Sequence, residues 1–254
     1  DQSEGLSRQM VELLPSCGLV DRQELGRLAA MLGVESSALV DGLAAQAGPE
    51  SRVVDDIHWL ICIAKLGSSR SNETAQRVAD TIVQLPGKME KEALQIDRNW
   101  VPRMTSVVEV LFESTGVTRA VVKHAELGRP EHVYLYRRLP ASLQREAATR
   151  FLEAVRQSPE HVTAEQLLIA VSADPDRSKS LLRSFADRPA LSDVVIQRLS
   201  RQPELADREL FYQGLLSADL ATVEMSAKAL RKLALELTPD EQLAAFSAAL
   251  SLGD

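Results

Sequence analysis

The stretch DPDRSKSLLRSFADRPALSDVVIQRLSRQPEL, residues 174–205, decides the fold class because its prolines recur at a fixed interval. Pro175, Pro189 and Pro203 are 14 residues apart. Proline is tolerated in the first turn of an α-helix and disfavoured beyond it, so each proline marks the expected start of a short helix. Two such helices with their turns make a unit of roughly 30–40 residues, the size of a helical-hairpin repeat.

The segment that follows has similar signals for the start and end of a helix, together with a clear apolar stripe. In DLATVEMSAKALRKLALEL (219–237), Val223, Ala227 and Leu230 follow the i, i+4, i+7 rhythm of an amphipathic helix. Asp219 stands where an N-cap belongs, and Pro239 opens the next helix. This segment therefore predicts two further helices.

The same criteria applied to the whole chain predict fifteen helices and no pair of strands. Their ranges are 3–14, 21–33, 36–46, 51–66, 71–85, 97–114, 117–127, 130–138, 141–157, 162–172, 176–186, 190–200, 204–216, 219–237 and 239–251. Segment 86–96 is predicted as a connecting turn or an extra helix. We predict an all-α fold, an irregular α-solenoid of HEAT-like helical hairpins, forming a single domain over residues 1–254. Because the chain begins at Asp1, we expect it to be a fragment of a longer protein.

Composition limits the classes of function. The net charge of −7 argues against general nucleic-acid binding, and an aromatic content of 4% argues against a platform of exposed rings. Cys17 and Cys62 are the only cysteines, which excludes a disulfide framework and a thiolate metal motif but leaves open a single bridge between the two. No apolar run reaches the roughly 18–20 residues that span a bilayer, so we predict no membrane insertion by this segment. Phosphate-loop, nucleophile-elbow, HExxH, CxxC and CxxCH motifs are also missing.

One helix carries a group of residues that could support chemistry. In VVDDIHWLICIAKLG (53–67), Asp55, His58 and Cys62 share a stripe at i, i+3 and i+7. They could activate a nucleophile or supply part of a metal site. Groups on one straight helix, however, cannot converge on a single atom without ligands from elsewhere. The rest of the helix is apolar nearly all round, so we interpret it as a core helix.

The middle of the chain combines bases, tyrosines and two histidines. Residues 101–150 carry 8 bases and 5 acids. Arg129, Tyr134, Tyr136, Arg137 and Arg138 form a predicted interaction surface, since arginine and tyrosine are common at protein interfaces. The alternatives are an anion or nucleic-acid site and a solvated face paired with local acids. The wider basic set is Arg103, Arg119, Lys123, Arg129, Arg137, Arg138, Arg145 and Arg150.

His124 and His132 flank the turn LGRP (127–130). Two imidazoles beside a tight turn could bind a metal. We expect capping or hydrogen bonding at the helix junction instead, because no carboxylate or thiol of matching spacing completes a ligand set.

Three stretches resemble a known family. DDIHWLICIAKLG (55–67), DRNWVPRMTSVVEVLF (97–112) and GRPEHVYLYRRLPASLQREAATRFL (128–152) resemble the HEAT-like helical region of large multidomain proteins of planctomycete-type bacteria, usually labelled membrane-bound dehydrogenases or heme-binding proteins. The resemblance covers roughly residues 50–170 and depends on Asp56, His58, Asn99, Trp100, Pro130 and His132. In those proteins a β-propeller of sugar-dehydrogenase type precedes the helical region, and a c-type heme domain follows it. The resemblance implies a helical spacer or docking module of an exported, extracytoplasmic redox protein whose chemistry lies in the other domains.

From these observations we expect a non-enzymatic scaffold without a cofactor, whose partners are other domains of the same polypeptide or another protein. A metal or enzymatic site at Asp55, His58 and Cys62 and an anion site among the basic residues of 103–150 remain the alternatives. The sequence leaves the oligomeric state open.

Overall fold

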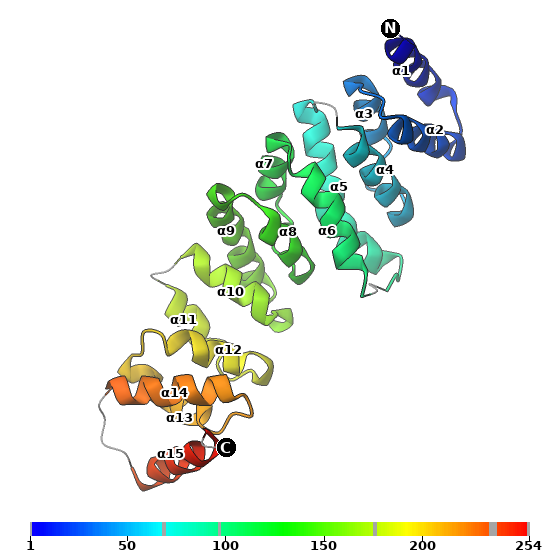
Figure 1. Ribbon diagram of the computed structural model, residues 1–254. Helices are drawn as coiled ribbons and strands as arrows, with labels where there is room; N and C mark the ends of the chain where they lie inside the picture. The colour runs from blue at the N-terminus through cyan, green and yellow to red at the C-terminus, as the bar shows by residue number, and fades with distance from the viewer. Residues whose placement is uncertain (1, 68–69, 96–97, 175–176, 234–237, 253–254) are drawn as a thin grey trace. The chain divides into compact units, whose positions relative to one another are not determined.

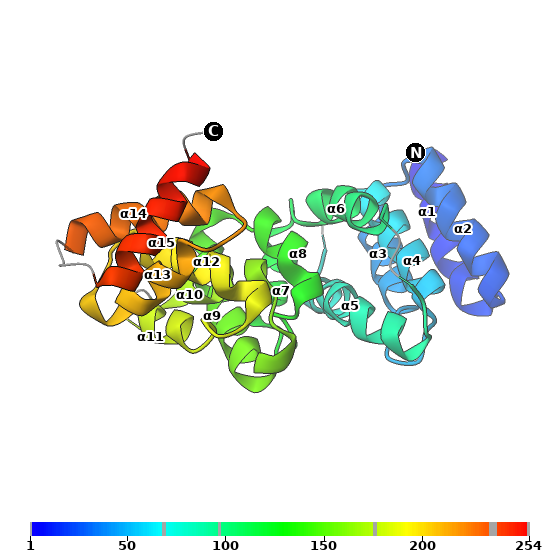
Figure 2. The ribbon, with the colours of Figure 1, turned by 90° about the horizontal axis from the view of Figure 1, so that it is seen from below.

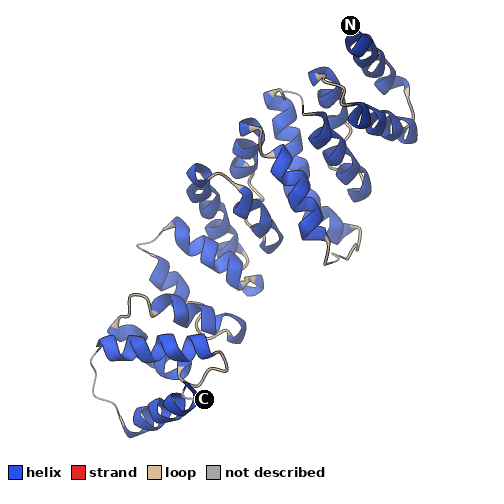
Figure 3. Ribbon diagram, in the orientation of Figure 1, coloured by secondary structure: helices blue, strands red, loops and turns tan. Residues whose placement is uncertain are grey.

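The computed structural model describes the chain except for residues 1, 68–69, 96–97, 175–176, 234–237 and 253–254. The described residues form helices joined by turns, with no strand among them (Figure 3), which confirms the all-α prediction. Each of the fifteen predicted ranges overlaps one observed α-helix. These are α1 (Gln2–Leu13), α2 (Leu19–Leu32), α3 (Ser37–Ala44), α4 (Val53–Leu66), α5 (Asn72–Lys91), α6 (Trp100–Leu111), α7 (Thr115–Lys123), α8 (Val133–Arg138), α9 (Ala141–Gln157), α10 (Ala164–Ala173), α11 (Ser178–Arg183), α12 (Pro189–Leu199), α13 (Arg208–Gly214), α14 (Leu220–Leu233) and α15 (Pro239–Leu252).

Short 3-10 segments precede or follow several of these helices. They are η1 (Leu14–Ser16), η2 (Pro130–His132), η3 (Pro159–His161) and η4 (Leu205–Asp207). Pro189 is the first residue of α12, as the proline spacing predicts. Pro203 instead lies two residues before η4, and Pro175 lies outside the described residues.

Local signals of the expected kinds set the helix ends. The Ser71 side chain accepts a hydrogen bond from the Thr74 N–H at 3.1 Å and caps α5. Asp219 Oδ1 accepts from the Ala221 N–H at 3.3 Å, as expected of the predicted N-cap of α14. Gly67 ends α4 with a φ of 63°, a left-handed conformation that glycine adopts without a Cβ clash. The predicted end of that α14 range, residues 234–237, lies outside the described residues.

The contacts divide the chain into two compact units, residues 1–154 and 155–254. The first unit consists of two rows of helices (Figure 1). In one row α1 packs on α3, α3 on α5 and α5 on α7, and in the other α2 packs on α4, α4 on α6 and α6 on α8. Figure 2 shows α6 and α8 on one side of this unit and α5 and α7 on the other. Each helix therefore contacts the next but one along the chain.

The core of the first unit lies between the two rows. Its members are buried side chains that recur at helical spacing on the inward faces, which satisfies the amphipathic pattern of the sequence. The largest fully buried ones are Trp59, Leu60, Ile63, Ile82, Leu85, Leu111, Leu127, Leu135 and Phe151, with Leu39 and Leu43 of α3.

The second unit is built in a related way. Helix α10 packs on α12 and α12 on α14, while α13 packs on α14 and α15. Helices α13 and α14 approach closely at Gly214, where an added Cβ would lie only 2.2 Å from Ser226 Oγ. Phe211 and Leu167 are fully buried in this unit.

Helix α5 departs from the sequence prediction at Pro86. The sequence predicts that the helix ends at residue 85, but α5 continues through Pro86 to Lys91, so that boundary is wrong. Proline removes the N–H that would bond to the Ile82 carbonyl and crowds the preceding turn. The neighbouring Val83 carbonyl accepts a hydrogen bond from His132 Nε2 at 2.9 Å. A buried side chain from another part of the unit thus contacts α5 at the residue that follows Ile82.

Candidate functional site

The predicted cluster on α4 faces α2. Asp55 Oδ1 accepts a hydrogen bond from Gln23 Nε2 at 2.7 Å, and His58 Nε2 lies 3.0 Å from the Gln23 carbonyl oxygen. Cys62 is buried, with its Sγ 3.5 Å from His58 Nε2. No hydrogen bond or ion pair joins Asp55 to His58 among the described residues. The helix therefore brings all three residues to one side, as the spacing predicts, but Asp55 and His58 direct their polar atoms to α2.

These contacts disfavour nucleophilic chemistry at Cys62. A carbonyl oxygen can only accept, so His58 Nε2 carries the proton and donates to Gln23. That nitrogen cannot then accept the proton of the thiol, which is the step that activates a cysteine. Burial also raises the pKa of Cys62 to about 11, so the thiolate is scarce near neutral pH. A cavity of about 290 Å³ lies beside His58, Cys62 and Met31. The arrangement fits a packed core helix.

Directly next to this cluster is a buried ion pair that the sequence does not reveal. Asp56 is fully buried, and its Oδ2 accepts from Lys88 Nζ at 2.5 Å while its Oδ1 accepts from Ser51 Oγ at 2.5 Å. Lys88 also donates to the Gly48 carbonyl and, at 3.3 Å, to the Ser51 carbonyl. Burial raises the pKa of Asp56, and the hydrogen bonds from Lys88 and Ser51 act in the opposite direction. The pair joins α4, α5 and the loop that precedes α4.

His132 acts at a helix junction. Its Nδ1 accepts from the backbone N–H groups of Gly128 and Arg129, each at 3.2 Å, and its Nε2 donates to Val83. Burial lowers its pKa to about 4, so the ring is neutral at physiological pH. This hydrogen bonding is the role that the sequence predicts for the histidines of this turn.

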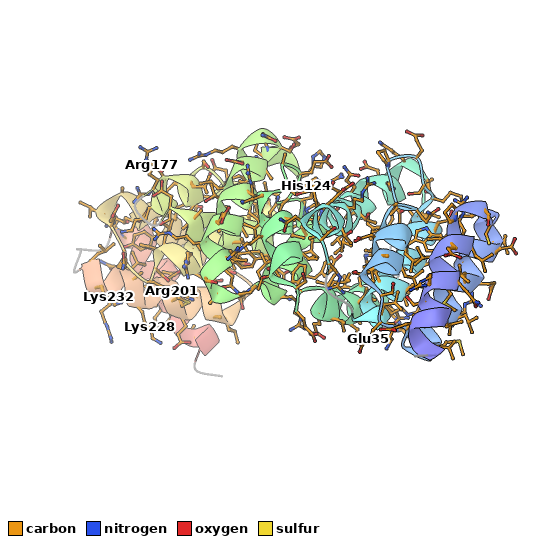
Figure 4. The ribbon with its side chains drawn as sticks, turned by 90° about the horizontal axis from the view of Figure 1, so that it is seen from above. Glu35, His124, Arg177, Arg201, Lys228 and Lys232 are labelled. Carbon is orange, nitrogen blue, oxygen red and sulfur yellow. The ribbon has the colours of Figure 1, made fainter. Side chains whose placement is uncertain are left out.

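His124 lies beside α7 and α5 (Figure 4), with its Nε2 3.5 Å from Asp80 Oδ1. Its Nδ1 accepts from the Glu126 N–H at 3.1 Å. Within the described part of the chain, no three His, Cys, Asp or Glu side chains are grouped so as to hold a metal ion.

Only some residues of the predicted interaction surface are exposed to solvent. Tyr134 is buried at 8% exposure and must be removed from it, because α8 turns that face towards the core. Tyr136 is half-buried and packs edge-on against Phe151, with ring centroids 5.7 Å apart. Leu135, between the two tyrosines, is fully buried and belongs to the core side of α8. Arg137 and Arg138 are exposed on the solvent side of the same helix.

Several of the predicted basic residues form ion pairs with acidic side chains. Arg129 pairs with Glu90 at 2.9 Å, Arg138 with Glu109 at 3.0 Å, and Arg150 with Glu153 at 3.0 Å. These exposed pairs match the solvated face that the sequence offers as an alternative, and each contributes little to stability.

Arg119 and Lys123 differ, because neither side chain makes a hydrogen bond or ion pair within the described residues. Both line a cavity of about 750 Å³ that lies at the first turn of α5 and extends along α7. Arg70, a residue outside the predicted basic set, lines the same cavity. No sequence motif brings Arg70 together with Arg119; the packing of α5 on α7 does so.

The second unit contains a polar network of its own. Arg183 donates to both carboxylate oxygens of the fully buried Asp207, at 2.6 and 3.1 Å, and pairs with Glu204 at 2.5 Å. Lys179 reaches the other oxygen of Glu204, also at 2.5 Å. Hydrogen bonds from Lys179 and Arg183 lower the pKa of Glu204. The network ties α11 to η4 and leaves its strongest acceptor, Asp207, inaccessible to a ligand.

None of the helices in the described residues combines the length and hydropathy of a membrane span, which is consistent with the prediction of no membrane insertion. Comparison of the chain with protein-family models, with curated proteins and with solved structures finds no match.

Proposed function

We propose that the protein is a non-enzymatic interaction module, built as an irregular α-solenoid of HEAT-like helical hairpins. The next-but-one packing of α1 to α8 supports this proposal, because stacked hairpins bury their apolar faces against neighbouring hairpins. The inward contacts of Asp55, His58 and Cys62 favour it over an enzymatic site. A scaffold of this kind offers a long helical surface to other domains or proteins.

The observation that carries the proposal is the uncovered apolar side of α2. Val20, Leu28, Met31 and Leu32 are between 46% and 77% exposed, and they lie at helical spacing on one side of the helix. Large apolar side chains grouped on one exposed face are characteristic of protein contact sites. We call these four residues the α2 face.

Photocrosslinking tests whether the α2 face contacts a protein. A benzophenone amino acid replaces Met31, which is 77% exposed, in cells that produce the protein. The matched control carries the same group at Glu73, whose side chain is 76% exposed on α5. We expect a discrete crosslinked product from position 31 that is lost when Leu28→Glu is added. Equal products from the two positions, or none from position 31, would contradict the proposal.

We further propose that the module is the helical spacer of an exported multidomain redox protein, as the family resemblance implies. The residues quoted for that resemblance are its support. The coding sequence on either side tests it: a β-propeller upstream and a CxxCH motif downstream are expected, and an isolated gene would contradict it.

A further inference from the structure

Three basic side chains line the 750 Å³ cavity, which lies at the first turn of α5 and extends along α7. Arg70 precedes α5, while Arg119 and Lys123 lie on α7. Thr115, Arg119 and Lys123 follow one another at i, i+4 and i+8, so they form one stripe along the cavity wall. The cavity therefore receives positive charge from α7 and from the loop that precedes α5.

None of these three cations forms an ion pair with a described residue, although Arg70 lies within the electrostatic range of Glu113. Arg119 and Lys123 make no ion pair with any described residue. Arg70 donates from Nη2 to the Ile63 carbonyl at 3.3 Å, but its buried Nε has no hydrogen-bond partner in the described part of the chain. Glu113 is the only acid that the described residues place in the lining. Three cations and one carboxylate give this lining a formal charge of +2, although the whole chain carries −7.

The first turn of α7 adds backbone N–H groups, whose partial positive charge also favours an anion in the cavity. The Ser114 side chain makes no capping hydrogen bond, so it does not satisfy the N–H groups of the first turn. Ser114, Thr115 and Gly116 all line the cavity. Gly116 also lets the helices approach closely, because an added Cβ would lie 3.2 Å from the Ala75 Cβ. These donors and the helix dipole favour an anion at the same place as the basic side chains.

We propose that this cavity binds a small organic molecule carrying a phosphate monoester, with the phosphate held by Arg70 and Arg119 at the first turn of α7. A phosphate monoester carries about −1.5 to −2 charges at pH 7, which matches the charge of the lining. Guanidinium groups bind phosphate oxygens through paired hydrogen bonds. The volume lies within the usual range for small-molecule sites and leaves room for an organic group beside the phosphate. This site is independent of the α2 face and goes beyond the proposed contact function.

Calorimetric titration of the whole chain tests the proposal, with phenyl phosphate, adenosine monophosphate and inorganic phosphate as probes. We expect saturable one-to-one binding of at least one monoester, tighter than that of inorganic phosphate. Arg119→Gln should weaken it by at least about tenfold, because it removes a charge-assisted contact. Glu113→Gln should strengthen it, because the variant removes the one acid that the described residues contribute to the lining.

Arg145→Gln is the matched control, since Arg145 is exposed in the same unit and lies outside the cavity lining. It should leave the affinity within twofold of the original. Circular dichroism confirms that each variant is folded. Absence of saturable binding of all three probes, or equal weakening by Arg119→Gln and Arg145→Gln, would overturn the proposal. Binding of a single-stranded oligonucleotide that depends on Arg119 as strongly as monoester binding does would overturn the small-molecule assignment.

Discussion

Replacing Lys88 with methionine tests the buried ion pair of the first unit. The variant leaves Asp56 fully buried, and among the described residues only the Ser51 hydroxyl still donates a hydrogen bond to it. It also removes the donor to the Gly48 and Ser51 carbonyls. Methionine and lysine have similar helix propensities, so α5 itself is little affected.

The expected loss of stability follows from this geometry. Removing one partner of a buried pair leaves an uncompensated charge, which costs about 3–5 kcal/mol. The loss should depend on pH. Without Lys88, the pKa of Asp56 rises further above its value in the unfolded chain, so the native state binds the extra proton. The variant is therefore expected to lose stability as the pH rises from about 4 through that higher pKa.

Urea unfolding followed by tryptophan fluorescence measures the effect, because Trp59 and Trp100 both lie in the first unit. Arg77→Met is the control: it removes one charge from the same helix, but breaks an exposed pair with Glu73 worth about 0.5 kcal/mol or less. If Lys88→Met lowers the free energy of unfolding by no more than Arg77→Met does, the stabilising role of the buried pair is refuted.

Three further outcomes are expected. A thiol-reactive chromophore should modify Cys17 in the native protein and leave Cys62 unmodified until urea unfolds the chain, because the Cys62 thiol is buried with a pKa of about 11; fast labelling of both would contradict this. The pKa of His132 falls from about 6.5 unfolded to about 4 folded, so the stability that it contributes is complete above pH 6.5 and should fall by about 3 kcal/mol as the pH drops to 4. His132→Ala should remove this pH dependence in fluorescence-monitored unfolding, and an unchanged slope would count against the assignment. Asp207→Asn should destabilise the second unit by about 2–3 kcal/mol in circular dichroism melts, because the variant breaks the paired contact with Arg183, and an unchanged melt would disprove that role.

The helices could be predicted from the sequence because their signals are local. Pro189 and Asp219 mark helix starts through their own backbone and side-chain chemistry. Pro86 is the exception, because the general rule ends a helix there. The helix continues past Pro86, and His132 donates a hydrogen bond to the Val83 carbonyl in the same turn. Because these two residues are 49 positions apart, no local sequence pattern predicts their contact.

The sites were less predictable because they depend on packing between helices. The stripe of Asp55, His58 and Cys62 was visible in the sequence, but the orientation of these groups towards Gln23 was not. Tyr134 looked like a surface residue beside two arginines and proved to be buried.

The basic residues that line the cavity could also be predicted only in part from the sequence. Arg119 belongs to the basic region visible in the sequence, whereas Arg70 joins it only because α5 packs on α7. A charge count along the chain places them in different regions, so it misses their convergence.

The most direct test of the next-but-one packing is an engineered disulfide between α5 and α7. A Cβ at position 116 would lie 3.2 Å from that of Ala75, close to the roughly 3.5–4.5 Å of a disulfide. Ala75→Cys and Gly116→Cys are combined with Cys17→Ala, and peptide mapping by mass spectrometry follows mild oxidation. The account predicts a 75–116 bond in the native protein and none when Arg137→Cys replaces Gly116→Cys. Absence of the 75–116 bond, or equal bonding in both pairs, would contradict it.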